Sequence, residues 1–276
     1  MDEEKIQWHP GFYAGMELEL RGFNLQFDSE YQLTRGPLSI DLLIIRKQKD
    51  QKIDVDFADV FRQHNIVEFK SPEDELSIDV FYKTQAYACL YKASGETINA
   101  IPADEVTVSL FRDAYPRKMV EQLKAQGFDI QERHPGIYEI RGPGYFLTQL
   151  VVTSRLESKQ HAILRILSDH AKRADVEEFI RSSSRYQDSG DLARADSVLQ
   201  VSVSANRELY RQISGEDSEM CQALREIMKE EFEKTEERTS LDYIRNLMET
   251  TNWSAKKAMD ALKIPASLQA EYASKL

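Results

Sequence analysis

Two short segments, LSIDLLIIRK at residues 38–47 and HNIVEFK at residues 64–70, constrain the fold of this chain most. The first is rich in β-branched and leucine side chains, and in the second Val67 and Phe69 alternate with Glu68 and Lys70 before a Ser-Pro turn, so both predict strands. An alternating segment at residues 24–33 predicts a strand before them. After them, residues 76–94 carry apolar side chains at helical spacing, and residues 105–113 again predict a strand. This order predicts an α/β fold, a small mixed sheet with flanking helices.

The remaining segments divide the chain into two regions. Residues 11–21 are interpreted as a helix or a short extended entry, residues 116–127 as a helix, and residues 137–142 and 145–156 as two edge strands. From about residue 157 glycine and proline become rare, and further helices are expected at 157–181, 191–213 and 218–249 and after Ser254 and Pro265. We therefore expect an α/β domain at residues 1–153 and an all-helical C-terminal region at residues 154–276.

Composition and charge narrow the classes of protein. The net charge is −11 over 276 residues and neither half is basic, which works against a general nucleic-acid-binding surface. No apolar run approaches the length of a membrane helix, and the N-terminus MDEEKIQWHP is acidic where a signal peptide would be basic. We expect a cytoplasmic protein with no membrane partner. Cys89 and Cys221 lie far apart in unlike contexts, which predicts two buried side chains and neither a disulfide framework nor a zinc site.

An acid and a lysine share one face of the strand expected at residues 64–70. Glu68 and Lys70 are two positions apart, so their side chains would point the same way, about 7 Å apart along the backbone. Asp41 interrupts the preceding aliphatic run, and its carboxylate can approach Glu68 if the two strands are neighbours. Two close carboxylates repel each other, and Mg²⁺ prefers such oxygen ligands. A lysine beside the ion suits the hydrolysis of a phosphodiester, because it can orient or deprotonate the attacking water.

Less specific interpretations of the same residues stay open. Glu68 and Lys70 could form an exposed ion pair on a solvated strand face, which would contribute little. Asp41 could be a strand-end acid bonded to backbone groups. The histidines show no metal-ligand spacing and are interpreted as structural: His9, His64, His134, His161 and His170.

Asp41 followed by Glu68-Phe69-Lys70, in this order of elements, resembles the PD-(D/E)XK nuclease superfamily, with Ile40 where the motif's proline would stand. Within the superfamily the chain is similar to the bacterial group of recombination-promoting nucleases and putative transposases. Four segments within residues 8–92 carry this similarity: WHPGFYAGMELELR, PLSIDLLIIRK, HNIVEFKSPED and YKTQAYACLYK. The resemblance implies a restriction-endonuclease-like fold for residues 1–153 and a Mg²⁺-dependent DNA endonuclease.

The resemblance also assigns roles to single residues. Metal ligands are expected at four positions: Asp41, Glu68, the backbone carbonyl of Phe69, and Glu17 on the first helix. Lys70 would be the catalytic lysine, acting with the three acids of that set. Glu19 competes with Glu17 as the acid of the first helix, and we favour Glu17. Gln85 is expected as an accessory polar residue.

The leading hypothesis is therefore a Mg²⁺-dependent endonuclease that acts on DNA and is associated with a mobile element or with recombination. The alternative is an inactive or domesticated nuclease fold that serves as a binding or assembly module, which the acidic composition favours. A hydrolase of smaller phosphate esters is a third interpretation. The short helices after Ser254 need a partner surface. Either the chain's own helix near residues 241–248 or a second subunit would supply it, so a homo-oligomer through the helical tail is one expected arrangement.

Overall fold

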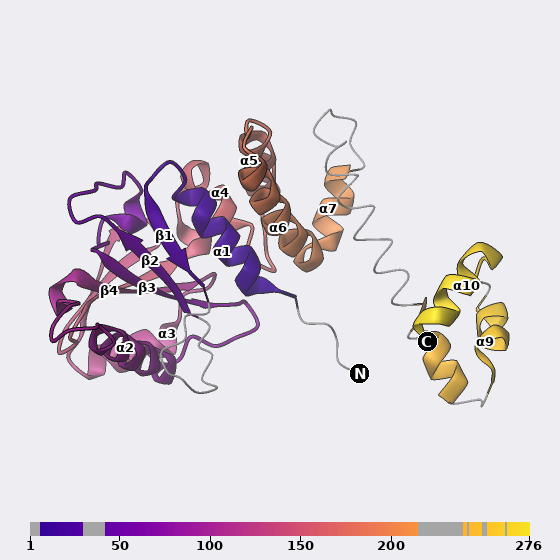
Figure 1. Ribbon diagram of the computed structural model, residues 1–276, viewed down its shortest axis with the longest axis horizontal. Helices are drawn as coiled ribbons and strands as arrows, with labels where there is room; N and C mark the ends of the chain where they lie inside the picture. The colour runs from indigo at the N-terminus through magenta and orange to yellow at the C-terminus, as the bar shows by residue number, and fades with distance from the viewer. Residues whose placement is uncertain (1–5, 30–41, 215–239, 242, 250–252, 263) are drawn as a thin grey trace. The chain divides into compact units, whose positions relative to one another are not determined.

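The structure, a computed structural model, describes residues 6–29, 42–214, 240–241, 243–249, 253–262 and 264–276. The chain forms two compact units, Met1–Ile213 and Ser214–Leu276 (Figure 1). Among the described residues, no helix combines the length and the apolarity that a membrane crossing requires.

The first unit is built on a mixed sheet of seven strands in the order β1-β2-β3-β4-β7-β6-β5. The strands are β1 (Leu25–Asp28), β2 (Leu42–Lys47), β3 (His64–Lys70), β4 (Val106–Arg112), β5 (Asp129–His134), β6 (Ile137–Arg141) and β7 (Leu147–Val152). β4 pairs in parallel with both β3 and β7, and the other neighbouring pairs are antiparallel. The predicted mixed α/β fold with flanking helices is confirmed.

Helices cover both faces of this sheet. α1 (Trp8–Glu19) lies on one face, and α2 (Ile78–Ala93) and α3 (Arg117–Ala125) lie on the other (Figure 1). Because side chains alternate along a strand, β3 sends Phe69 toward α1 and Ile66 toward α2. Phe69 stacks on Phe12 of α1 with ring centroids 4.2 Å apart, while Ile66 joins a core cluster with Phe81 of α2. α2 begins at Ser77, whose side chain caps the helix, and it connects the parallel strands β3 and β4.

The C-terminal part of the sheet differs from the prediction. The two strands expected at its edges, β6 and β7, are interior: β7 lies between β4 and β6, and its residues 148–152 are buried. The edge is β5, which the sequence did not predict because its residues are polar and almost all exposed. Cys89 on α2 is exposed, so its predicted burial was wrong; Cys221 lies outside the described residues.

Four helices continue the first unit beyond residue 153. They are α4 (Ser158–Arg165), α5 (Arg173–Ser183), α6 (Ser189–Ala205) and α7 (Arg207–Ser214). α4 and α5 replace the single helix predicted at residues 157–181, and α6 and α7 replace the one predicted at residues 191–213. Arg165 Nε and Nη2 donate to the two carboxylate oxygens of Asp175 at 2.9 Å, and Nη1 donates to the carbonyls of Ser154 and Leu156 at 2.7 Å. The compact unit runs to Ile213, and the expected division of the chain at residues 153/154 stays a prediction.

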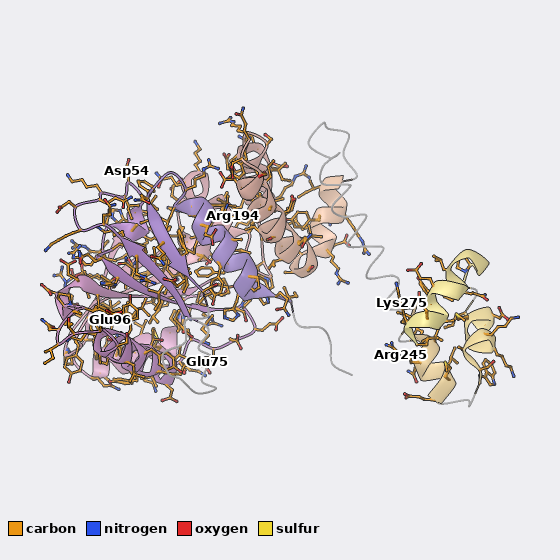
Figure 2. All side chains as sticks on the ribbon, in the orientation of Figure 1. Asp54, Glu75, Glu96, Arg194, Arg245 and Lys275 are labelled. Atoms are coloured by element: carbon orange, nitrogen blue, oxygen red, sulfur yellow. The ribbon has the colours of Figure 1, made fainter. Side chains whose placement is uncertain are left out.

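The second unit contains α9 (Ala255–Ala261), α10 (Ala266–Lys275) and helical residues at 240–241 and 243–249. Ser254 caps α9, as predicted, and Arg245 Nη2 donates to the carbonyl of Lys275 at 2.8 Å (Figure 2). A small core joins the three segments through Leu241, Ile244, Ala258, Met259 and Tyr272. The expectation that the short helices pack on the chain's own helix is confirmed, and a homo-oligomer through this region stays a prediction.

The contact between α1 and α6 gives a test of the fold. A Cβ atom at Gly11 would lie 2.7 Å from Cγ2 of Val201, closer than carbon atoms tolerate. We expect Gly11→Val to lower the free energy of unfolding by about 1–3 kcal/mol, because it overpacks a tight interface. Urea unfolding measures the change. Combined with Val201→Ala, the loss should be smaller than the sum of the two single variants, whereas additive losses would contradict this packing.

Candidate active site

Glu68 and Lys70, the predicted acid and lysine, are in contact at the end of β3. Lys70 Nζ lies 3.0 Å from Glu68 Oε1, and only 16% and 3% of the two side chains are exposed. The alternative of an exposed pair on a solvated strand face is therefore wrong. A buried ion pair is costly unless its geometry and surroundings compensate for the lost hydration. Packing alone does not explain why the ion pair of Glu68 and Lys70 is buried.

Positive charges act on Glu68, but they do not cancel the effect of burial on its pKa. Burial raises the pKa of the Glu68 carboxyl above its ordinary value, and the positive charges of Lys70, Lys83 and His9 oppose this rise without cancelling it. Lys83 belongs to α2, and His9, in the first turn of α1, contacts the ring of Phe69. His9 Nε2 is buried and has no hydrogen-bond partner among the described residues. The carboxylate would gain from a further cation.

The strand register determines which neighbour faces Glu68. Leu42, the first residue of β2, lies directly across from Glu68 in the antiparallel pair. Asp41 precedes Leu42 in the sequence and lies outside the described residues. The approach of Asp41 to Glu68 therefore stays a prediction. No group of three or more His, Cys, Asp or Glu side chains suited to a metal ion occurs in the described part of the chain.

The other predicted site residues have partners elsewhere. Glu17 forms an ion pair with Arg194 of α6, and Gln85 Nε2 donates to Thr148 Oγ1 of β7 at 3.0 Å. His9 contacts the ring of Phe69, and Glu17 follows His9 by eight positions on α1, about 12 Å along the helix axis. The structure thus brings together Glu68 and Lys70 and does not bring Glu17 or Gln85 to them. The role of the Phe69 carbonyl stays a prediction.

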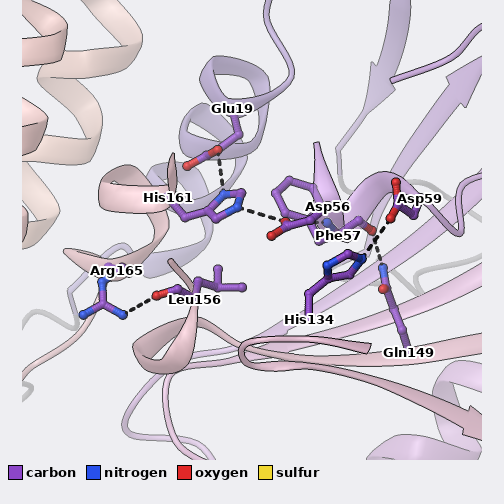
Figure 3. Close-up of polar contacts among 9 residues, drawn as sticks. All are labelled: Glu19, Asp56, Phe57, Asp59, His134, Gln149, Leu156, His161 and Arg165. Carbon is purple, nitrogen blue, oxygen red and sulfur yellow. Dashed lines mark hydrogen bonds and ion pairs between the residues drawn. The ribbon is translucent and has the colours of Figure 1, made fainter. Parts of the chain in front are cut away.

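A second group of ionisable side chains lies under the last turn of α1 (Figure 3). His161 of α4 has its Nδ1 atom 3.1 Å from Glu19 Oε2 and its Nε2 atom 2.9 Å from Asp56 Oδ1. Asp56 begins the short 3₁₀ helix η1 (Asp56–Ala58). Glu19 and His161 are almost completely buried. The three residues tie together α1, η1 and α4.

Burial and pairing act against each other in this group. Burial alone would lower the pKa of His161, but the hydrogen bonds and charges of Asp56 and Glu19 outweigh it and raise the pKa to about 9. For Asp56 the pairing with His161 also prevails and lowers its pKa, whereas burial prevails for Glu19 and raises its pKa. Near neutral pH the group therefore contains a protonated imidazolium held by two carboxyl groups.

This geometry gives the group a structural role. An imidazolium held between two carboxyl groups and excluded from solvent cannot exchange protons readily with a substrate. His161 was interpreted as structural, but its partners were not identified, because Glu19, Asp56 and His161 are distant in sequence and no spacing rule relates them. The structure places Glu19, not the favoured Glu17, in the more buried position on α1.

Comparisons of the chain with protein-family models, with curated proteins and with solved structures found no match. The geometry of these side chains and the sequence motif are therefore the basis for inferring a function.

The buried histidine predicts a loss of stability at alkaline pH. The folded-state pKa of His161, about 9, exceeds its ordinary value of 6.5, so the stabilisation is fully present below about pH 6.5 and is lost as the pH rises through 9. We expect the wild type to exceed His161→Gln in free energy of unfolding at pH 7, and this difference to shrink at pH 10. Urea titrations at both values measure it. His170→Gln, at an exposed histidine, is the control; a constant difference for His161→Gln would contradict the assignment.

Proposed function

We propose that this protein is a Mg²⁺-dependent nuclease that hydrolyses DNA phosphodiesters at a site formed by Asp41, Glu68 and Lys70. The observation that carries the proposal is the buried contact between Glu68 and Lys70 at the end of β3. The order α1-β1-β2-β3-α2-β4 around this pair supports it, because the same motif in the same order is typical of the restriction-endonuclease-like fold of the PD-(D/E)XK superfamily.

The electrostatics of Glu68 favour a metal ion at this site. The pKa of the Glu68 carboxyl stays raised although a lysine lies beside it, so its surroundings lack positive charge. A hard cation that prefers oxygen ligands would supply this charge. Asp41 would contribute the second carboxylate from the residue next to Leu42. For this, its side chain must turn to the sheet face that Leu42 and Glu68 share. The carbonyl of Phe69, between the two motif residues, would be a further oxygen ligand.

The residues of the chain have distinct tasks in this proposal. Mg²⁺ would activate a water molecule for attack and neutralise charge on the phosphate. Lys70, held by Glu68, would donate a hydrogen bond to that water or to a phosphate oxygen, and Glu68 would keep the ammonium group in position. Lys83 of α2 adds positive charge that acts on the same carboxylate. The local charge therefore suits a phosphodiester although the net charge of the chain is −11.

A structure determined with Mg²⁺ would test the ligand set. We expect carboxylate oxygens of Asp41 and Glu68 within about 2.0–2.1 Å of one ion, since Mg²⁺ holds its oxygen ligands at that distance. Lys70 should lie beside the ion without coordinating it. A structure in which Asp41 and Glu68 point to opposite faces of the sheet would eliminate this site.

A plasmid-nicking assay with Mg²⁺ would test the activity. We expect Glu68→Gln to abolish nicking, because it removes a metal ligand, and Lys70→Ala to lower the rate by about 10²- to 10⁴-fold. Circular dichroism and thermal unfolding would show that both variants remain folded.

Glu157→Gln and Lys159→Ala are matched controls for this assay. These residues have the same acid-x-lysine spacing at the start of α4, and both are exposed. Neither substitution should change nicking. Equal nicking by the wild type and Glu68→Gln would point to another active site or to a contaminant. A wild type that binds Mg²⁺ through Glu68 and does not nick would favour the alternative of a nuclease fold that acts as a binding module.

A further inference from the structure

A cavity of about 290 Å³ lies on the sheet face opposite to the side chain of Glu68. Glu68 is in register with Leu110 and Leu150, which belong to the core under α2 and α3. Gln149, on the adjacent position of β7, points to the other face and lines the cavity. The cavity therefore does not belong to the proposed catalytic site.

Guanidinium groups surround the mouth of this cavity. Arg141 donates to both carboxylate oxygens of Glu139, from Nε at 2.6 Å and from Nη2 at 3.0 Å. Arg133 Nε lies 3.4 Å from the same carboxylate. More than half of each of these arginine side chains is exposed, whereas Glu139 is mostly buried beneath them. Arg62, also exposed, completes the mouth and has no carboxylate partner in the described part of the chain.

The charges at the mouth do not cancel. Two arginines share the single negative charge of Glu139, which leaves one positive charge, and Arg62 adds a second. Asp59 supplies one negative charge and is 3.0 Å from His134 (Figure 3). Asp56, the remaining acid of the lining, is paired with His161. The mouth is thus a net positive region on an acidic protein, with guanidinium donors left over.

The floor of the cavity is polar. Gln149 Nε2 donates to the carbonyl of Phe57 at 2.7 Å, as Figure 3 shows, and to Ser109 Oγ at 2.9 Å. These two bonds fix the amide. Its Oε1 atom has no hydrogen-bond partner among the described residues. An unpartnered acceptor below and guanidinium donors above suit a ligand that carries an anion at one end and a hydroxyl group at the other.

We propose that this cavity binds a small phosphomonoester, with the phosphate held by Arg62 and Arg141 and the hydroxyl groups directed toward the floor. Planar guanidinium groups bind phosphate with paired hydrogen bonds, and exposed donors at the mouth reach the ligand without rearrangement of the core. The volume lies just below the usual range for ligand pockets, about 300–1,000 Å³, which fits a sugar phosphate better than a larger molecule.

Isothermal titration in the presence of EDTA tests this proposal separately from the nuclease proposal, because it needs neither metal nor catalysis. We expect ribose 5-phosphate to bind with a Kd of about 1 mM or lower, and inorganic phosphate to bind more weakly because it lacks the hydroxyl groups. Arg62→Gln and Arg141→Gln should each weaken binding about tenfold or more, since each removes charge-assisted hydrogen bonds. Glu139 keeps Arg133 as a partner in Arg141→Gln, so the fold should be preserved.

Arg117→Gln, at an exposed arginine on α3, is the matched control and should bind like the wild type. Glu68→Gln and Lys70→Ala should also bind like the wild type. No binding of ribose 5-phosphate, or binding that the Arg62 and Arg141 variants do not weaken, would overturn the proposal. Loss of binding in Lys70→Ala would overturn it too, because the phosphate would then occupy the catalytic site. If a 5′-phosphorylated oligonucleotide binds more tightly, with the same dependence on Arg62 and Arg141, the ligand is the phosphorylated end of a nucleic acid and the proposal of a small phosphomonoester is wrong.

Discussion

The packing of α1 between the sheet and α6 determines where the ionisable side chains of this helix can act. Phe12 stacks on a phenylalanine of β3, and Gly11 lets α6 approach on the other side. With the helix fixed from both sides, its first turn places His9 near the end of β3. Its last turn places Glu19 beside a buried histidine, and Glu17 faces α6. One helix therefore connects the candidate active site to the helices that follow the sheet.

Two interior strands were the most predictable part of the fold. The expected strands at residues 64–70 and 105–113 correspond to β3 and β4 within a residue at each end, because β-branched and aromatic side chains in short segments that end at turn residues favour a strand. β7 was recognised as a strand but assigned to an edge, since alternation along one strand does not show which neighbours pair with it. β5 escaped recognition because an exposed edge strand can be polar throughout.

The two groups of charged residues also differ in how far the sequence predicts their contacts. Glu68 and Lys70 are two positions apart on one strand, so their proximity follows from local geometry and was predictable from the sequence. Glu19, Asp56 and His161 meet only through the packing of three elements, and nothing in their spacing indicates it. Glu17 and Gln85 were expected at the site from the sequence, but the fold gives them other partners. Glu17 pairs with Arg194, and Gln85 donates to Thr148.

The sheet also separates charges that the composition averages. On the face of α2, Lys70 contacts the buried carboxylate of Glu68, and on the opposite face Arg62 and Arg141 border the cavity above Gln149. A net charge of −11 is compatible with both, because a strand alternates its side chains between two faces and can present different charges on each. Net charge therefore bears on solubility and on long-range association, whereas the chemistry of a site depends on the few charges that share its face.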